Sequence, residues 1–167
     1  MLVSLLMLAL TLSLSPPEPE PQVGDNRVIV ISEFENTREA IEHVVKHVLL
    51  PRRIVPLRCD VDMGYIVTER FYYWRAFNCD LVFSFRENDG HVVVEFFGRG
   101  YEVSANLLTI YHDILVKSKK DMKGSASSYY WDTVIPGIVE DIPNVGHGYY
   151  GHDDVIDKEA QRPTISF

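Results

Sequence analysis

The clearest group of potential metal ligands lies near the end of the chain, where histidine, aspartate and glycine are concentrated. The candidate ligands in this segment are His147, His152, Asp153 and Asp154. Imidazole nitrogens and carboxylate oxygens together bind divalent metals such as zinc or nickel. Three glycines in the same segment would make a preformed site costly in conformational entropy. The segment therefore has two interpretations, a loosely held tail or a metal site to which His112 could contribute.

A second spacing that could bind metal is formed by His43 and His47, which lie one helical turn apart. Zinc proteases use this spacing, but they need a glutamate directly after the first histidine as the general base. Here that position is Val44. We therefore interpret the pair as part of a solvated helix face.

The segment from Asp60 to Gly64 resembles the start of a calcium-binding loop. Such a loop needs a third oxygen ligand before the glycine and a glutamate at its twelfth position. Counted from Asp60, that position is Phe71. Aspartate and glycine also favour tight turns, so the segment is predicted to be a turn between strands.

A run of aromatic residues beside arginine is the candidate binding surface. Its members are Tyr72, Trp74, Arg75 and Phe77. Successive residues of a strand face opposite sides, so such a run places aromatic rings on both faces. One face must be core, and the other is either an exposed patch that binds a partner or a glycan, or a surface covered by a second layer from the tail.

Other chemistries are not indicated by the sequence. It contains no Gly-x-Ser-x-Gly elbow, phosphate-binding loop or dinucleotide fingerprint, so we predict no catalytic residues and no cofactor. The 167 residues carry a net charge of −8. Proteins that bind nucleic-acid phosphates usually carry a basic stripe, so no nucleic-acid partner is expected.

The N-terminal residues predict export. Residues 1–15 carry no charge, and residues 2–14 are mostly apolar, with polar breaks at Ser4, Thr11 and Ser13. This run is too short for a spanning helix, which needs about 20 residues, and is typical of the core of a signal peptide. Four prolines follow within residues 16–25, which favours an extended spacer. We expect a periplasmic or cell-envelope location, with no membrane span after signal removal.

The elements that must position these residues follow from hydrophobic periodicity. Strands are predicted at 27–32, 54–59, 65–74, 78–87 and 91–97, with a weaker strand within 101–117 that also fits a helix. Asp89-Gly90 predicts a hairpin between the last two firm strands. A helix over 37–50 is capped by Asn36 or Thr37, with Glu39 placed for a capping box with Asn36, and is stopped by Pro51. After a loop over 117–128, a second helix spans 129–142, kinked at Pro136–Gly137.

This order predicts a single α+β domain over residues 26–143, with a curved antiparallel sheet of four to six strands packed against two helices. Residues 144–167 are expected to form a flexible tail. The helix at 37–50, the segment 60–67 and the strands around Asn88-Asp89-Gly90 resemble small exported envelope proteins with a TATA-binding-protein-like or helix-grip fold. The resemblance covers about residues 27–142 and implies neither DNA binding nor catalytic residues.

The two cysteines are predicted to be unbonded. In this meander Cys59 and Cys79 lie two strand spacings apart, about 9–10 Å. A disulfide needs Cα atoms within about 7 Å. Both thiols are therefore expected to be free and buried, although an oxidising compartment would permit a bond.

The sequence favours a non-enzymatic envelope protein with a binding or assembly role, whose partner is an envelope protein, a glycan or a small ligand. Two alternatives stay open. One is a metal-binding protein or metal-dependent hydrolase that uses the C-terminal His/Asp cluster. The other is a carrier that holds a small ligand between the sheet and a helix, in a pocket of about 300 Å³ or more.

Overall fold

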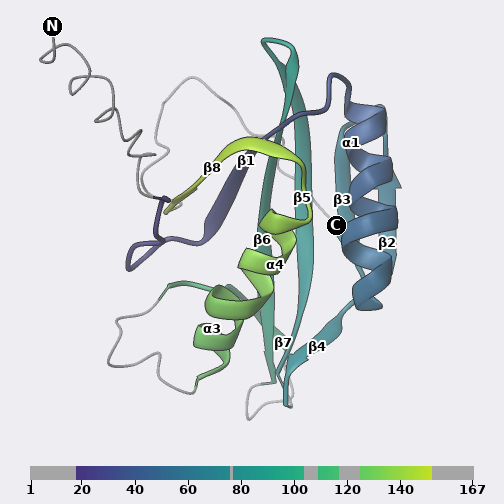
Figure 1. Ribbon diagram of the computed structural model, residues 1–167. Helices are drawn as coiled ribbons and strands as arrows, with labels where there is room; N and C mark the ends of the chain where they lie inside the picture. Colours follow the sequence, from purple (N-terminus) through teal and green to yellow (C-terminus); the bar gives the residue numbers. More distant parts are fainter. Residues whose placement is uncertain (1–17, 76, 104–108, 117–124, 152–167) are drawn as a thin grey trace, which may run out of the picture.

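A computed structural model of the chain describes residues 18–75, 77–103, 109–116 and 125–151. These residues form one antiparallel sheet with two helical segments on the same face (Figure 1). The predicted α+β class and the packing of the sheet against two helices are confirmed. None of the helices in these ranges has the length and hydrophobicity needed to cross a bilayer.

The sheet has eight strands, more than the four to six predicted. They are β1 (Arg27–Ser32), β2 (Pro56–Asp60), β3 (Tyr65–Thr68), β4 (Phe71–Trp74), β5 (Phe77–Asn88), β6 (His91–Val103), β7 (Thr109–Asp113) and β8 (Asn144–Tyr150). Their order is β2-β3-β5-β6-β1-β8, with β4 paired to β5 and β7 paired to β6. The long strands β5 and β6 form the centre (Figure 1).

The turn between β5 and β6 is the tight hairpin that Asp-Gly predicts. Asn88 and His91 are register partners, and the two residues between them have positive φ angles, 48° at Asp89 and 80° at Gly90. A two-residue turn of this kind matches the twist of the flanking strands and favours Asp-Gly. This hairpin sets the register of the two longest strands.

The first helical segment follows β1 and consists of α1 (Thr37–His43), a wider π turn η1 (Val44–Leu49) and a 3-10 turn η2 (Leu50–Arg52). The predicted cap is confirmed, because Asn36 Oδ1 accepts a hydrogen bond from the Glu39 amide at 3.0 Å. The helical backbone ends at Arg53, which adopts a left-handed conformation.

The second helical segment begins earlier than predicted. It comprises α3 (Ala126–Tyr129), a π turn η3 (Tyr130–Val134) and α4 (Ile135–Glu140). Ser125 caps it by accepting the Ser128 amide at 3.1 Å, so the serines taken for a loop start the helix. The helix is irregular just before Pro136, where proline has no amide hydrogen to complete the α-helical pattern.

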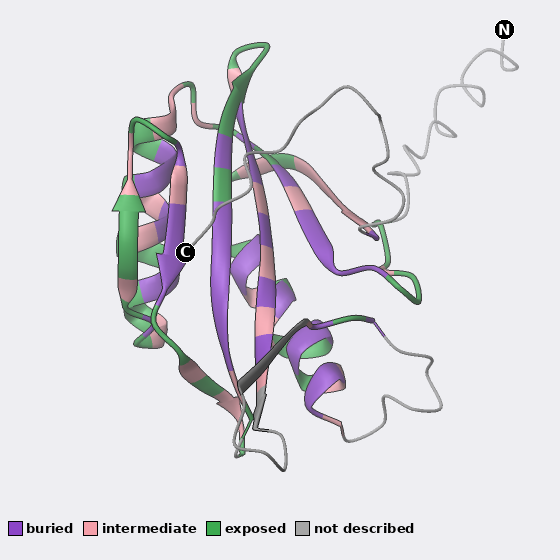
Figure 2. Cartoon of the chain, turned by 180° about the vertical axis from the view of Figure 1, so that it is seen from behind, coloured by how far each residue is buried: buried purple, intermediate pink, exposed green. Residues whose placement is uncertain are grey.

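One hydrophobic core joins both helical segments to one face of the sheet. Along β5 the core-facing side chains Cys79, Leu81, Phe83 and Phe85 are buried, while Ser84 and Arg86 on the other face are exposed (Figure 2). The rings of Phe83 and Phe96 stack with centroids 5.0 Å apart. Apolar side chains therefore fill the space between sheet and helices.

A close approach between β6 and the second helical segment requires glycine at position 98. A Cβ added to Gly98 would lie 2.5 Å from the hydroxyl oxygen of Tyr130. Tyr130 is 1% exposed, and its hydroxyl has no hydrogen-bond partner among the described residues. The ring thus packs directly on the β6 backbone.

Arg52 links the two helical segments. Its guanidinium donates to the carbonyl of Val48 at 2.8 Å, to the carbonyl of Gly137 at 2.7 Å and to Asp141 Oδ2 at 2.6 Å. Hydrogen bonds from a charged donor contribute more than neutral ones. Arg52 therefore fixes the end of the first helical segment against α4.

Strand β8 lies where the sequence predicts the start of a flexible tail. It pairs with β1 along its length, so the sheet continues past the predicted domain boundary at residue 143. His147 and Tyr149 alternate with Gly146 and Gly148, and this glycine content hides the two-residue period from sequence reasoning. Residues 152–167 of the predicted tail lie outside the described residues.

The cysteines are both unbonded, as predicted. Strand β3 lies between β2 and β5, which separates Cys59 from Cys79. Cys79 is buried, but Cys59 is exposed, so the prediction that both are buried is wrong for Cys59. The reason is that β2 is the edge strand of the sheet, which leaves its side chains open to solvent.

Candidate functional site

The hairpin between β4 and β5 brings together the four residues of the predicted aromatic patch. We call Tyr72, Trp74, Arg75 and Phe77 the β4–β5 tip. Trp74 and Phe77 are register partners, and Arg75, which follows Trp74, has a φ of 48°. Strand β4 reaches this turn at one end of the sheet, at the bottom of Figure 1.

A register shift in β4 determines which of its rings lies opposite Phe77. Tyr72 is paired with Asn78 and Trp74 with Phe77, so Tyr73 is an extra residue on the β4 side. A bulge of this kind changes the direction in which the following side chains point. Tyr73 faces the core, where its ring centroid lies 5.8 Å from that of Tyr130. Burial raises the pKa of Tyr73 to about 12.

Two rings of the tip, Trp74 and Phe77, contact each other; Trp74 is half-buried, whereas Tyr72 and Phe77 are exposed. The centroids of Trp74 and Phe77 are 5.5 Å apart, and the Arg75 guanidinium carbon lies 4.5 Å above the Trp74 ring. Tyr72 is 74% exposed and Phe77 is 50% exposed. Arginine over an aromatic face is a cation–π contact that holds the charge beside the rings. The tip is thus an exposed aromatic surface with one cation, anchored to the core through Tyr73.

No protein-family model and no curated protein sequence matches this chain. Besides the tip, the described residues carry three further polar features: a row of charges on the outer face, the predicted metal ligands, and two surface hollows.

The row of charges crosses four strands on the face away from the helices. Asp80 of β5 accepts two hydrogen bonds from Arg99 of β6, at 2.8 Å and 2.6 Å. The register then places Arg99 opposite Asp113 of β7. Asp113 in turn accepts a hydrogen bond from Arg27 of β1 at 3.0 Å. Sequence reasoning missed this row, because its members come from segments far apart in the chain.

Most charged atoms of the row are engaged by other members, although Arg27 Nε is buried without a hydrogen-bond partner among the described residues. The hydroxyl of Tyr101 also donates to Asp80, and burial together with this carboxylate raises the Tyr101 pKa to about 12. Arg27 lies with its guanidinium carbon 3.6 Å above the Phe97 ring. Paired ions of this kind orient strands and leave few polar atoms to act on a substrate. We assign the row a structural role.

The predicted metal ligands are only partly described. His147 lies in β8 and faces α4, and its ring centroid is 5.6 Å from that of Tyr149. His152, Asp153 and Asp154 lie outside the described residues, and only the backbone of His112 in β7 is described. Within the described ranges, no three His, Cys, Asp or Glu side chains are close enough to share a metal ion.

The two other predicted metal-binding patterns, His43 with His47 and the segment Asp60–Gly64, make contacts within the fold. His43 Nε2 donates to the carbonyl of Asp141 at 2.8 Å, so this histidine joins α1 to the end of α4 instead of pointing into solvent as predicted. His47 lies beside it, with ring centroids 4.8 Å apart. Asp60 Oδ1 accepts the Met63 amide at 2.9 Å, which confirms the predicted turn.

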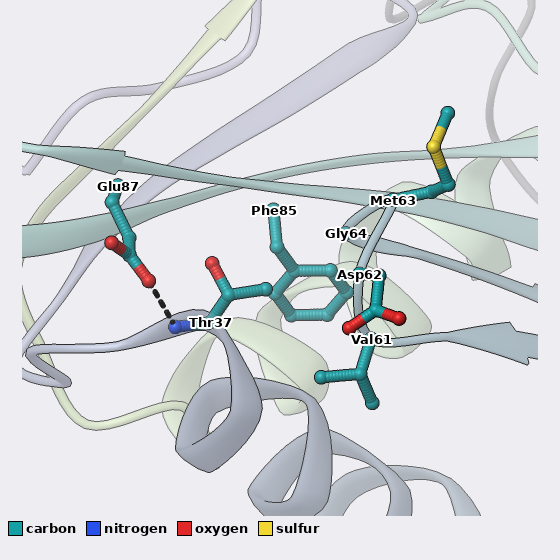
Figure 3. A pocket seen from close by; sticks show the side chains of 7 residues that line it. All are labelled: Thr37, Val61, Asp62, Met63, Gly64, Phe85 and Glu87. Carbon is teal, nitrogen blue, oxygen red and sulfur yellow. Dashed lines mark hydrogen bonds between the residues drawn. The ribbon is translucent and has the colours of Figure 1, made fainter.

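Two hollows lie at the surface of the described residues. One, of about 450 Å³, lies between α4, β8 and the spacer residues Glu18 and Pro19, and His147 lines it. The other, of about 340 Å³, lies where the turn before β3 meets the start of α1 (Figure 3). There Glu87 accepts the Thr37 amide at 2.9 Å. A Cβ at Gly64 would lie 2.5 Å from the Phe85 carbonyl oxygen, so the turn needs glycine.

Proposed function

We propose that the chain is a non-enzymatic, exported protein of the cell envelope that binds a partner through the β4–β5 tip. The observation that carries this proposal is the exposure of Tyr72 and Phe77 beside the stacked pair of Trp74 and Arg75. Export is proposed from the apolar segment 1–15 and the proline-rich spacer that follows it.

The side chains of the tip are those that contribute most to binding. Tryptophan, tyrosine and arginine are enriched among residues whose truncation weakens protein interfaces most. Burying a large apolar side chain completely stabilises it by about 1.5–3 kcal/mol relative to leaving it in water. An exposed ring lacks this stabilisation until a partner covers it. Several such rings at one exposed turn therefore favour a contact surface over a purely structural hairpin.

Strand β4, which leads into the tip, is also anchored to the core. Tyr73 is fixed against Tyr130, and the neighbouring Phe71 packs against the same core. The bulge at Tyr73 therefore couples one inward ring to the outward rings on both sides of it. Preorganisation of this kind lowers the entropy lost when a surface binds its partner.

The buried charges support a role without catalysis. The carboxylates of Asp80 and Asp113 are engaged by arginines, and a catalytic carboxylate would have to reach a substrate. The hollow near Thr37 is likewise shaped by a hydrogen bond within the protein.

Site-specific photo-crosslinking in the cells that produce the protein tests this proposal. A photoreactive amino acid at position 72 should form a discrete adduct with a partner molecule, and the added substitution Trp74→Ser should abolish it. Met63 is the matched control, because it is 69% exposed against 74% for Tyr72 and lies in a different turn. Adducts of equal yield at positions 72 and 63, or none at position 72, would refute the role of the tip.

A further inference from the structure

We infer that the partner of the β4–β5 tip is the lipid–water interface of a phospholipid bilayer. This inference rests on the proposed function, because it takes the tip as the contact surface. It adds the chemistry of the partner, which neither the exposure of the rings nor the predicted export specifies.

The composition of the tip matches that interface. Tyrosine and tryptophan combine an apolar ring with a polar group and concentrate at the headgroup level of membranes. Tyr72 and Trp74 are therefore suited to the headgroup level, while the half-exposed ring of Phe77 can enter the acyl boundary. The 5.5 Å contact between Trp74 and Phe77 makes these two rings one continuous apolar surface.

The charge of the tip is complementary to phosphate headgroups. Arg75 is exposed and lies over Trp74, so its positive charge remains beside the ring that would sit among the headgroups. The chain as a whole carries a charge of −8, so an anionic surface repels the molecule on average. These opposite tendencies predict that only the tip enters the interface and that the sheet and helices stay in water.

The shape of the tip favours a bilayer over a protein partner. The tip is a hairpin turn at the end of the sheet, and the two hollows described above are lined by other residues (Figure 1). A protein partner needs a groove complementary to these four side chains, whereas a bilayer accepts any exposed turn with apolar and basic side chains. A protein groove is the outcome of the test that would replace this inference.

Intrinsic tryptophan fluorescence tests the inference directly, because the chain has two tryptophans in different environments. Trp131 is 3% exposed in the core, and Trp74 is at the tip. Vesicles of phosphatidylcholine with a minor fraction of phosphatidylglycerol should shift the emission of the wild-type protein to shorter wavelength. Trp74→Phe should show no shift, because its remaining tryptophan does not meet lipid.

Partitioning onto the same vesicles gives the quantitative result. Phe77→Ser should reduce the partition coefficient about tenfold, because it removes an apolar ring that the bilayer would bury. Arg75→Glu should reduce it further on vesicles that contain phosphatidylglycerol than on pure phosphatidylcholine. Met63→Ser is the control, because it removes a comparably exposed apolar side chain outside the tip and should leave partitioning unchanged.

Two results would overturn the inference: no spectral shift of the wild-type protein with vesicles, or partitioning that Phe77→Ser and Met63→Ser change equally. The crosslinking experiment then separates the two proposals. A protein adduct at position 72 without vesicle binding would reject the bilayer and retain the tip as the binding surface. Absence of both would reject the proposed function as well.

Discussion

The hydroxyl of Tyr130 is a buried polar group that the fold does not satisfy. The residue is 1% exposed, and its hydroxyl has no partner in the described part of the chain. A buried hydroxyl without a hydrogen bond costs about 1–3 kcal/mol. Tyr130→Phe removes that oxygen and keeps the ring contacts with Tyr73 and Trp131, at centroid distances of 5.8 Å and 5.5 Å. We therefore expect the substitution to stabilise the protein.

The expected gain in the free energy of unfolding is about 1–2 kcal/mol, which corresponds to a rise in Tm of about 2–6 °C. Urea denaturation followed by circular dichroism should show a higher midpoint with an unchanged m-value. Tyr101→Phe is the matched control, because the same atom is removed where the hydroxyl donates to Asp80. That control should lower the free energy of unfolding. If both substitutions destabilise the protein equally, the reasoning about Tyr130 is refuted.

Three further predictions concern packing, helix contacts and pH. Gly98→Ala should lower the free energy of unfolding by about 1–3 kcal/mol, because the added Cβ clashes with Tyr130. Tyr130→Phe should restore part of that loss in the double variant. If the effects of the two substitutions on the free energy of unfolding are additive in denaturation, the contact is contradicted. Arg52→Met should lower the free energy of unfolding by about 1–2 kcal/mol, because it removes the hydrogen bonds that join the two helical segments. Lys46→Met, which breaks an exposed ion pair, should change it little. Equal losses in the two variants would refute the link between the helical segments. Stability should be constant up to a pH near 9 and fall from there to about 12, because burial raises the pKa of the Cys79 thiol above its unfolded value of 9.0 and the pKa of Tyr73 and Tyr130 above 10.0, so that unfolding releases their protons. Thermal melts across that pH range check this, and Tyr130→Phe should show a shallower decline.

Local signals in the sequence predicted most of the elements correctly. Asp89-Gly90 fixed the central hairpin, and Asn36 with Glu39 marked the start of the first helix, because both signals act between neighbouring residues. The predicted strand over 65–74 is instead two strands. The Glu69 amide leaves the pairing with β5 and donates to the Val55 carbonyl at 2.8 Å, a contact that no local pattern shows.

Long-range pairing explains the other differences. Strand β8 pairs with β1, more than a hundred residues earlier in the chain, and its glycines lower its intrinsic strand preference. The row from Asp80 to Arg27 likewise depends on the order of four strands. The members of the tip could be named from the sequence, because all four lie between positions 72 and 77 and Trp74 pairs directly with Phe77. The resemblance to TATA-binding-protein-like and helix-grip proteins stays a prediction.

The bulge at Tyr73 determines which side chain of β4 lies beside Phe77 at the tip. In a regular ladder the pairing of Tyr72 with Asn78 would place Tyr73 opposite Phe77, whereas in the structure Trp74 is opposite Phe77. Tyr73 still packs on the core side, like Phe71, and the extra residue brings Trp74 to Phe77. A substitution that disturbs Tyr130 should therefore also change the position of the tip. Because Trp131 contacts Tyr130, Trp74 emission is measured in a Trp131→Phe background. It should be unchanged by Tyr130→Phe, since the ring that supports Tyr73 is retained, whereas Tyr130→Ala should alter it.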